Sequence, residues 1–414
     1  MFDLLELVAT EPRSGPDGRE SGEWQAVQMR PPIGGTVTTE FEDLRDVFVE
    51  NFTATDDDPG DLGASLCVIR GGEVVVDLWG GWTDKGMTSP WQHDTLLNIY
   101  SVGKAVAAVT ALRLVDRGDL DLDEPLAAVW PEMTGEGRET ITLRHALAHR
   151  AGLPAVREPL PDHAIFDWDE MCGALATTRP WWTPGDAHGY HTNTFGFLVG
   201  EPVCRALGTS FDRALAQLTT GPAGAEDLFI GLPASEHARC AEMDVFGVES
   251  VDFVPAPQEG DEDGLLARNA YFNPRTMSGM GVVDTEPWRE AMVPSTNGHA
   301  TARSVAAFYA ALMPSAGEGR LLGDALLREA TSVQADGMDR VLGRPSRFGL
   351  GFMLHQDERP IGIGPTSFGH FGYGGSLGFA DLDADLAFAY LISRPGDRWQ
   401  MPRTRRLLSS LTQR

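Results

Sequence analysis

The chain has 414 residues, which is enough for two or three domains of ordinary size, and 42% of them are hydrophobic, as in proteins with a packed core. Its 60 acidic and 33 basic residues give a formal net charge of −27, which argues against a partnership with nucleic acid or with an anionic membrane surface. The four cysteines are widely spaced and form no C-x-x-C pair, so neither a zinc site nor a thioredoxin-like motif is expected.

The N-terminus has no basic region followed by a long apolar stretch, so no signal peptide is predicted. No run of 18 apolar residues occurs in the chain, and therefore no transmembrane helix is predicted. We expect a cytoplasmic protein. Residues 1–33 are polar and rich in glycine and proline, which indicates an N-terminal extension that wraps the surface or is partly disordered.

The first predicted elements are a helix and a hairpin. Apolar residues recur at helical spacing over residues 38–52, which predicts an amphipathic helix. Two β-rich runs, 64–70 and 73–81, flank a Gly-Gly pair and predict two antiparallel strands. Residues 101–117 are almost wholly apolar and end at a glycine, which predicts a helix buried on most sides.

The rest of the chain changes character twice. Residues 141–290 combine helical patterns with Gly/Pro loops and few strands, and include predicted helices at 143–149 and about 194–207. Near the C-terminus we expect three strands and a closing helix. The sequence therefore predicts an α+β fold, an antiparallel sheet flanked by helices, in a discontinuous domain of residues 34–140 and 291–414 with a mainly helical domain, 141–290, inserted. The three predicted strands are 348–354, 367–376 and 378–393, and the closing helix is 401–412.

Ser101 and Lys104 are spaced as S-x-x-K, which places both side chains on one face of the predicted helix. Ser101 lies near the helix N-terminus, where free N–H groups favour a developing oxyanion. Lysine is rare here, since Lys85 and Lys104 are the only two among 33 basic residues. Apolar neighbours are expected to lower the pKa of Lys104, so that it acts as a base, which arginine does not do. The alternative is a serine N-cap followed by a surface lysine.

Tyr190 lies in a glycine-containing loop, residues 184–193, just before a predicted helix. Such a loop can hold the tyrosine rigidly over a site. Beside a cationic lysine its phenolate form is expected to be favoured, which would let Tyr190 transfer a proton. The alternative is a tyrosine packed within a connecting loop.

A glycine-rich segment, residues 369–378, is expected to let a strand edge approach a ligand closely and donate an N–H to an oxyanion. It also contains a match to G-x-S-x-G, centred on Ser376. That motif requires a helix after the serine and a histidine further along, but a strand is predicted and the last histidine is His370. We therefore reject Ser376 as the nucleophile. His145 and His149 lack the glutamate of H-E-x-x-H, so they are interpreted as structural, and neither a metal nor a cofactor is expected.

Taken together, these segments resemble the serine β-lactamase and penicillin-binding protein superfamily. Within it, the chain is most similar to the class C β-lactamase-like carboxylesterases called family VIII esterases. The resemblance implies a β-lactamase/DD-peptidase-like fold over nearly the whole chain from about residue 34. It rests also on the stretches 94–104, 120–125, 143–154, 294–299 and 348–352.

The resemblance implies a role for each matching residue. Ser101 would be the acylated nucleophile and Lys104 its partner base. Tyr190 would relay protons to the leaving group and activate the deacylating water. His370, Phe371 and Gly372 would replace the K-T-G motif as substrate-binding residues. The backbone N–H groups of Ser101 and Tyr373 would form the oxyanion hole.

Two departures from the motifs affect the expected substrate. The asparagine of the tyrosine motif falls three residues on instead of two, which leaves open whether Asn193 or Thr192 takes its place. His370 replaces a lysine, and the loss of that permanent cation favours neutral esters over anionic lactams or D-Ala peptides. Several aromatic residues are candidates to line an apolar pocket, with burial in the core as the alternative. They are Trp168, Trp181, Trp182, Phe371 and Tyr373.

The sequence thus predicts a serine carboxylesterase that hydrolyses short-chain or aryl esters through an acyl-enzyme, with weak β-lactam hydrolysis or acyl transfer as side activities. One alternative is an amidase or peptidase acting on D-amino-acid substrates, and another is a binding protein of the same fold. The expected partner is a small-molecule ester, with no nucleic acid and no membrane. The oligomeric state stays open, with a homodimer as one option.

Overall fold

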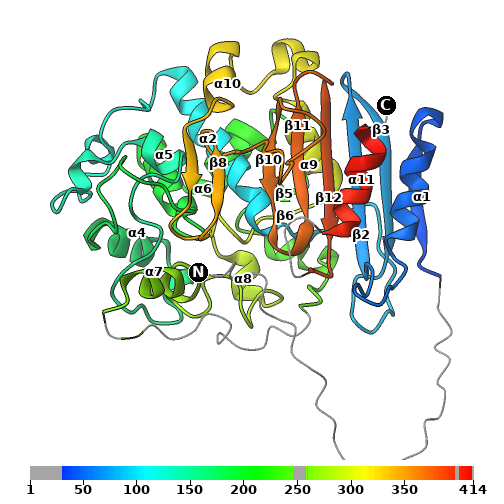
Figure 1. Cartoon of the computed structure of the whole chain (residues 1–414), viewed down its shortest axis with the longest axis horizontal. Coiled ribbons are helices and arrows are strands. Elements are labelled where there is room, and N and C mark those ends of the chain that lie inside the picture. Colours follow the sequence, from blue (N-terminus) through cyan, green and yellow to red (C-terminus); the bar gives the residue numbers. More distant parts are fainter. Residues whose placement is uncertain (1–29, 246–257, 259, 397–400, 413–414) are drawn as a thin grey trace, which may run out of the picture.

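The computed structural model of the protein describes residues 30–245, 258, 260–396 and 401–412 (Figure 1). Residues 1–29, which make up most of the predicted N-terminal extension, lie outside these ranges. Ile33, the last residue of that extension, opens the first strand.

Within the described residues, nine antiparallel strands form one sheet in the order β1-β3-β2-β12-β11-β10-β9-β8-β7. Strands from the first and last parts of the chain are neighbours inside this sheet, because β2 pairs with β12 from Ala64↔Ile392 to Arg70↔Leu386. The predicted hairpin is confirmed, with Gly71 and Gly72 in the left-handed turn between β2 and β3. The strands are β1 Ile33–Val37, β2 Gly63–Arg70, β3 Glu73–Gly81, β7 Ala335–Met338, β8 Pro345–Phe348, β9 Met353–Leu354, β10 Ser367–Phe371, β11 Leu377–Asp381 and β12 Leu386–Ile392.

Side chains alternate between two cores on either side of the sheet, as the two-residue period of a strand requires. On β12, the large residues Leu386, Phe388 and Tyr390 face one core, while Ala387 and Ala389 face the other. The small alanines allow helix α9 (Ala302–Ala310) to pack closely against β12 and β2. On the opposite face, α1 (Glu42–Glu50) packs against α11 (Pro402–Thr412), as Figure 1 shows.

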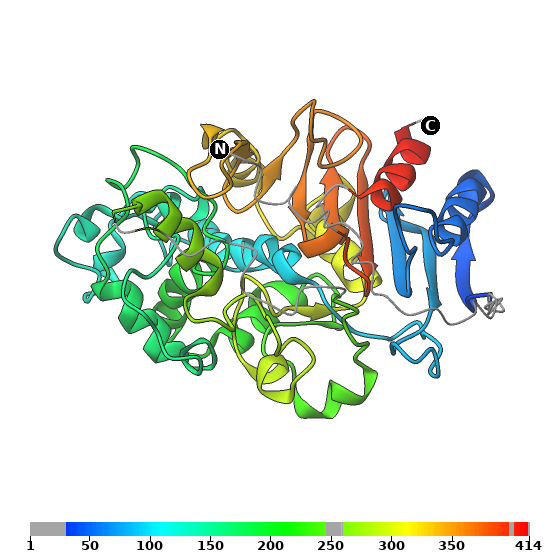
Figure 2. The ribbon, with the colours of Figure 1, turned by 60° about the horizontal axis from the view of Figure 1, so that its bottom comes forward.

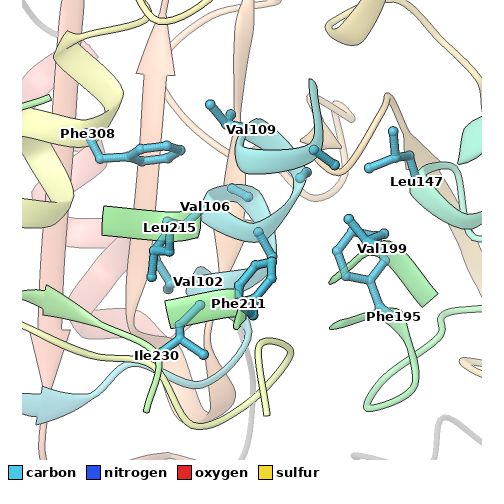
Figure 3. Packing of buried hydrophobic residues seen from close by; sticks show 14 of the residues in the cluster. Val102, Val106, Val109, Leu147, Phe195, Val199, Phe211, Leu215, Ile230 and Phe308 are labelled. Atoms are coloured by element: carbon cyan, nitrogen blue, oxygen red, sulfur yellow. The ribbon is translucent and has the colours of Figure 1, made fainter. Parts of the chain in front are cut away.

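Helix α2 (Gly103–Arg117) runs through the interior of the molecule, and the prediction of a helix buried on most sides is confirmed. Its valines contact side chains from several directions, including Leu147, Phe195 and Phe308 (Figure 3). Gly118 ends the helix in the left-handed conformation that glycine adopts without strain. The first turn of α2 is therefore fixed by packing on all sides.

The described residues between 141 and 290 form mostly helices, which gather on the side of the molecule away from α1 and α11 (Figures 1 and 2). A small antiparallel sheet, β4-β6-β5, lies among the connections. The predicted domain boundaries stay a prediction. These elements are α3 Leu143–Leu147, α4 Trp168–Thr177, α5 Phe195–Leu207, α6 Phe211–Leu215, α7 Glu262–Phe272, α8 Glu286–Glu290, β4 Leu97–Asn98, β5 Leu228–Phe229 and β6 His299–Ala300, with α10 Asp324–Ala330 following in the last third of the chain.

The three strands predicted near the C-terminus are wrong in their lengths. Residues 378–393 contain a turn, because Asp381 accepts a hydrogen bond from the Ala384 N–H at 3.0 Å and Asp385 is left-handed. Apolar and polar residues alternate through this turn, which hid it in the sequence. Residues 348–354 likewise bend at Gly351, and 367–376 leaves the sheet after Phe371. The closing helix is confirmed as α11.

All four cysteines are free thiols, with Cys67 and Cys172 buried and Cys204 and Cys240 half-buried. Burial raises the pKa of the Cys240 thiol to about 11. Among the described residues, the helices are too short or too polar to traverse a lipid bilayer.

Candidate active site

Ser101 lies in a 3-10 turn, Tyr100–Val102, that leads directly into α2. Tyr100 has a φ of 47°, a left-handed conformation that is strained for a bulky residue and that clusters at functional sites. The end of β10 presses against this turn, since a Cβ at Gly372 would lie 2.7 Å from the Ile99 carbonyl oxygen. The serine is thus held rigidly, with 9% of its surface exposed.

Lys104 lies one helical turn after Ser101 and is fully buried. Its Nζ lies 2.8 Å from Ser101 Oγ, within hydrogen-bond distance, and donates a hydrogen bond to the Ser295 carbonyl oxygen at 3.0 Å. Burial lowers the pKa of Lys104 well below its usual value, because a charged ammonium loses its hydration there. The neutral amine therefore has a lone pair within reach of the Ser101 proton.

The Tyr190 side chain lies beside both residues, since Lys104 Nζ is 4.9 Å from the centre of its ring and its hydroxyl hydrogen-bonds the Ser101 side chain. Burial raises the pKa of Tyr190 well above 10, against the opposing effect of a hydrogen bond with the Ser101 side chain. The predicted phenolate is therefore wrong. Its premise was a cationic lysine, but the same burial that disfavours the phenolate also disfavours the ammonium on Lys104.

His370 lies on β10, at the side of the site that faces the sheet, and its Nε2 is 3.5 Å from Tyr190 Oη. Its Nδ1 lies 2.7 Å from the Phe371 carbonyl oxygen, which only accepts hydrogen bonds, so Nδ1 carries the proton and Nε2 is the acceptor. Burial, together with the nearby Lys104, lowers the pKa of His370 to about 3. His370 is thus neutral, where a lysine would carry a charge.

The candidate oxyanion donors are the backbone amides of Ser101 and Tyr373. Tyr373 begins a 3-10 turn directly after β10, and its ring packs 5.3 Å from that of Tyr100. Within the part of the chain that the structure describes, neither amide donates a hydrogen bond to a protein acceptor. A tetrahedral intermediate requires such free donors, and an oxyanion hole formed by these two amides stays a prediction.

The Beta-lactamase family matches residues 48–412 of the sequence. The chain belongs to the Beta-lactamase family. A relative from Mycobacterium tuberculosis (strain ATCC 25618 / H37Rv), described as "Esterase/beta-lactamase LipL", is 30% identical over 361 residues, which cover 80% of this chain and 77% of LipL.

Solved structures that resemble this Beta-lactamase family protein agree with that assignment. A family VIII carboxylesterase superposes with a TM-score of 0.81 at 34% identity, covering 92% of this chain and 98% of that one. A penicillin-binding protein homologue from Caulobacter crescentus gives a TM-score of 0.81 at 36% identity, covering 92% and 99%. The predicted α+β fold is confirmed, and the chain is a hydrolase of the esterase and beta-lactamase fold.

In this Beta-lactamase family chain, Asn193 is hydrogen-bonded through both ends of its amide, and its Oδ1 accepts from Thr296 Oγ1 at 3.2 Å. It is fully buried, and its Nδ2 donates to the Ala270 carbonyl oxygen at 2.9 Å and to Ser278 Oγ at 3.0 Å. Both amide hydrogens are therefore used, and a role of Asn193 in substrate binding stays a prediction. Thr192 hydrogen-bonds the Tyr271 side chain, and burial raises the pKa of Tyr271 to about 12. Thr192 and Asn193 thus connect the Tyr190 loop to α7 by hydrogen bonds.

Two of the candidate pocket residues, Trp168 and Trp182, lie in different surroundings. Trp168 stacks on Phe211 at 6.1 Å and donates to Glu201, so it belongs to the helical core. Trp182 is nearly buried against the Tyr190 loop, with its ring 6.0 Å from that of His191. A role for Trp182 in substrate binding stays a prediction.

Sequence reasoning missed several residues that the structure brings to the site. Ser295, whose carbonyl accepts from Lys104, lies in a stretch noted only for its resemblance. His149 was interpreted as a structural helix residue, but it follows α3 with a φ of 58° and packs 5.0 Å from Tyr190. Asp339 binds the Tyr190 loop from 149 residues away, a separation that leaves no local signal. Among the described residues, no group of His, Cys, Asp and Glu is arranged to hold a metal.

The buried histidines predict a loss of stability in acid. Burial lowers the pKa of both His191 and His370 to about 3, against about 6.5 in the unfolded chain. Between these values the unfolded state binds more protons, so the free energy of unfolding should fall by about 1.4 kcal/mol per histidine for each pH unit below about 6. Urea unfolding at pH 7.5, 6 and 5 measures this slope.

Two variants separate these histidines from other acid effects. His191→Gln removes one titrating group and should make the slope shallower by about one proton. His93→Gln changes an exposed histidine and should leave the slope unchanged. A free energy of unfolding that stays constant from pH 6.5 to 5 would contradict the prediction.

Proposed function

We propose that the protein is a serine carboxylesterase that hydrolyses neutral carboxylic esters through an acyl-enzyme on Ser101. The observation that carries the proposal is the continuous contact of four side chains, Lys104, Ser101, Tyr190 and His370. A neutral lysine, a serine at a helix N-terminus and a protonated tyrosine together supply a base, a nucleophile and an acid.

Acylation follows from these protonation states. Ser101 Oγ attacks the ester carbonyl carbon and transfers its proton to Lys104, while the amides of Ser101 and Tyr373 hold the oxyanion. The bond to the leaving alcohol then breaks as Tyr190 protonates the departing oxygen, and the proton on Lys104 restores the tyrosine. The raised pKa of Tyr190, caused by burial, suits a group that stays protonated until the alcohol leaves.

Deacylation reverses these steps with water in place of the alcohol. Water gives a proton through Tyr190 to Lys104 and attacks the acyl carbon, and Ser101 departs with the proton returned. The acid product and the free enzyme result. No group outside this chain is needed for the proton balance.

Charge supports neutral esters as the substrate class. His370 is neutral, and the formal net charge of the chain is −27, so an anionic acyl group would enter an unfavourable field. The names of LipL and the family VIII carboxylesterase support ester hydrolysis, without distinguishing neutral from anionic esters. A D-amino acid amidase at 21% identity supports the fold alone. A cytoplasmic location and a small-molecule ester partner remain part of the proposal.

The test compares esters that differ in charge alone. We expect kcat/KM for p-nitrophenyl hexanoate to exceed that for the mono-p-nitrophenyl ester of adipic acid by about 10- to 100-fold, with a gap that narrows at high salt. A chromogenic cephalosporin should be turned over more slowly than either ester. Equal rates for the neutral and anionic esters, or faster hydrolysis of the cephalosporin, would contradict the proposal.

A further inference from the structure

Asp339 lies on the loop between β7 and β8 and is fully buried. Its Oδ1 accepts a hydrogen bond from the backbone N–H of Tyr190 at 3.0 Å. Tyr190 itself lies on a loop without regular structure, between α4 and α5. The carboxylate therefore ties the tyrosine to the edge of the main sheet.

The same carboxylate closes its own turn. Oδ1 also accepts from the N–H groups of Val341 and Leu342, both at 2.9 Å, and Oδ2 accepts from the Ser346 hydroxyl at 2.8 Å. Four donors therefore offset the cost of burying the charge of Asp339. Because the acceptor is fixed by its own hairpin, Tyr190 is attached to a rigid point.

Two further contacts join the Tyr190 loop to the hairpin. His188 Nε2 lies 3.0 Å from Ser346 Oγ, and since the Ser346 hydrogen goes to Asp339, His188 is the donor. The ring of Tyr190 stacks on Phe348 of β8 with an interplanar angle of 5° and a separation of 5.9 Å. Backbone position and ring plane of Tyr190 are thus both set by β7–β8.

We infer that Asp339 is a positioning residue, which holds Tyr190 where its hydroxyl meets Ser101 and His370. The inference rests on the proposed function, in which Tyr190 protonates the leaving alcohol. A displaced tyrosine backbone would carry the hydroxyl away from the departing oxygen, while Lys104 on α2 and Ser101 in the turn before it would stay in place.

The test exploits the leaving group. The p-nitrophenolate ion departs without protonation, whereas an alkoxide must be protonated as it departs. Asp339→Ala should lower kcat/KM, which reports acylation, about 100-fold for ethyl butyrate and less than about fivefold for p-nitrophenyl butyrate. Tyr190→Phe should show the same selectivity, and the double variant should lose little more than Tyr190→Phe alone.

Two variants guard against a purely structural effect. Asp339→Asn keeps the size and one oxygen acceptor, so it should fold and retain most of the ethyl butyrate activity that Asp339→Ala loses. Asp336→Ala removes an exposed carboxylate of the same hairpin, which pairs with Arg347 at 2.9 Å, and should leave both rates unchanged. Rates are expressed per active site titrated by the p-nitrophenol burst.

The outcomes are distinguishable. Equal losses on the two esters in Asp339→Ala, with selective loss in Tyr190→Phe, would overturn the positioning role and leave the proposed function intact. Equal losses in Tyr190→Phe would overturn both, because the tyrosine would then not protonate the alcohol. If Asp339→Ala does not fold, Asp339→Asn carries the test, and a loss that is equal for the two esters and additive with that of Tyr190→Phe would overturn the role.

Discussion

Ser101→Ala is expected to lower kcat/KM for p-nitrophenyl butyrate by about 10⁴- to 10⁶-fold, the largest effect of any single substitution. The variant keeps the fold, because the serine side chain fills little volume at the start of α2. It removes the oxygen that bonds to the acyl carbon, so no acyl-enzyme forms. Steady-state hydrolysis measures the loss, and mass spectrometry after an organophosphonate ester should find the label on Ser101 of the wild type alone.

Ser376→Ala is the matched control for the nucleophile. Its Oγ accepts a hydrogen bond from the Ile392 N–H at 3.2 Å, and a strand follows it directly, so it is a structural residue of the sheet. The variant should retain activity within about tenfold, since one neutral hydrogen bond is worth about 1 kcal/mol. Activity that survives Ser101→Ala and disappears in Ser376→Ala would overturn the assignment.

Lys104→Arg is expected to lower kcat/KM by about 10³- to 10⁴-fold for the same ester, the loss of a general base. Arginine keeps the positive charge and the hydrogen-bond donors but does not deprotonate in proteins, so it cannot accept the serine proton. It also places a larger ion in a position that is fully buried. Lys85→Arg, which changes the other lysine at an exposed position, should keep full activity. Full activity in Lys104→Arg would refute the base role.

The pH dependence of the wild type tests the same residue. Burial lowers the pKa of Lys104 well below its usual value, so the amine is neutral above that pKa and protonated below it. The ratio kcat/KM should therefore rise with pH through the pKa of Lys104 and be lost in acid, with a slope of one. A profile that falls as the pH rises through neutrality would contradict a neutral lysine base.

Local sequence patterns were sufficient for the elements that build the nucleophile. The apolar run of residues 101–117 predicted a buried helix, and the scarcity of lysine singled out Lys104. Burial is a collective property of such a run, so the direction of the lysine pKa followed as well. The predicted phenolate of Tyr190 was wrong because the tyrosine is itself buried, which raises its pKa, and a loop sequence gives no sign of that burial.

Residues that act across long distances in the sequence left little or no trace in it. In the sequence, Asp339 is indistinguishable from the other acidic residues in turns. It gains four hydrogen-bond donors only when β7–β8 folds against the Tyr190 loop. Asn193 matched a motif by type, yet its amide is used to hold α7. The ends of the strands were predicted wrongly because polar and apolar residues alternate in the Asp-Ala-Asp turn before β12, as they do in a strand.

The enclosure of α2 has a consequence for how the enzyme fails. Helix segments packed on all sides exchange their amide hydrogens only when most of the structure opens, whereas loops open alone at a small cost. Ser101, the proposed nucleophile, and Lys104 belong to such an enclosed segment, so a local opening does not expose them. The Tyr190 loop, in contrast, can open alone, so we expect heat to displace the tyrosine before it displaces the serine and the lysine.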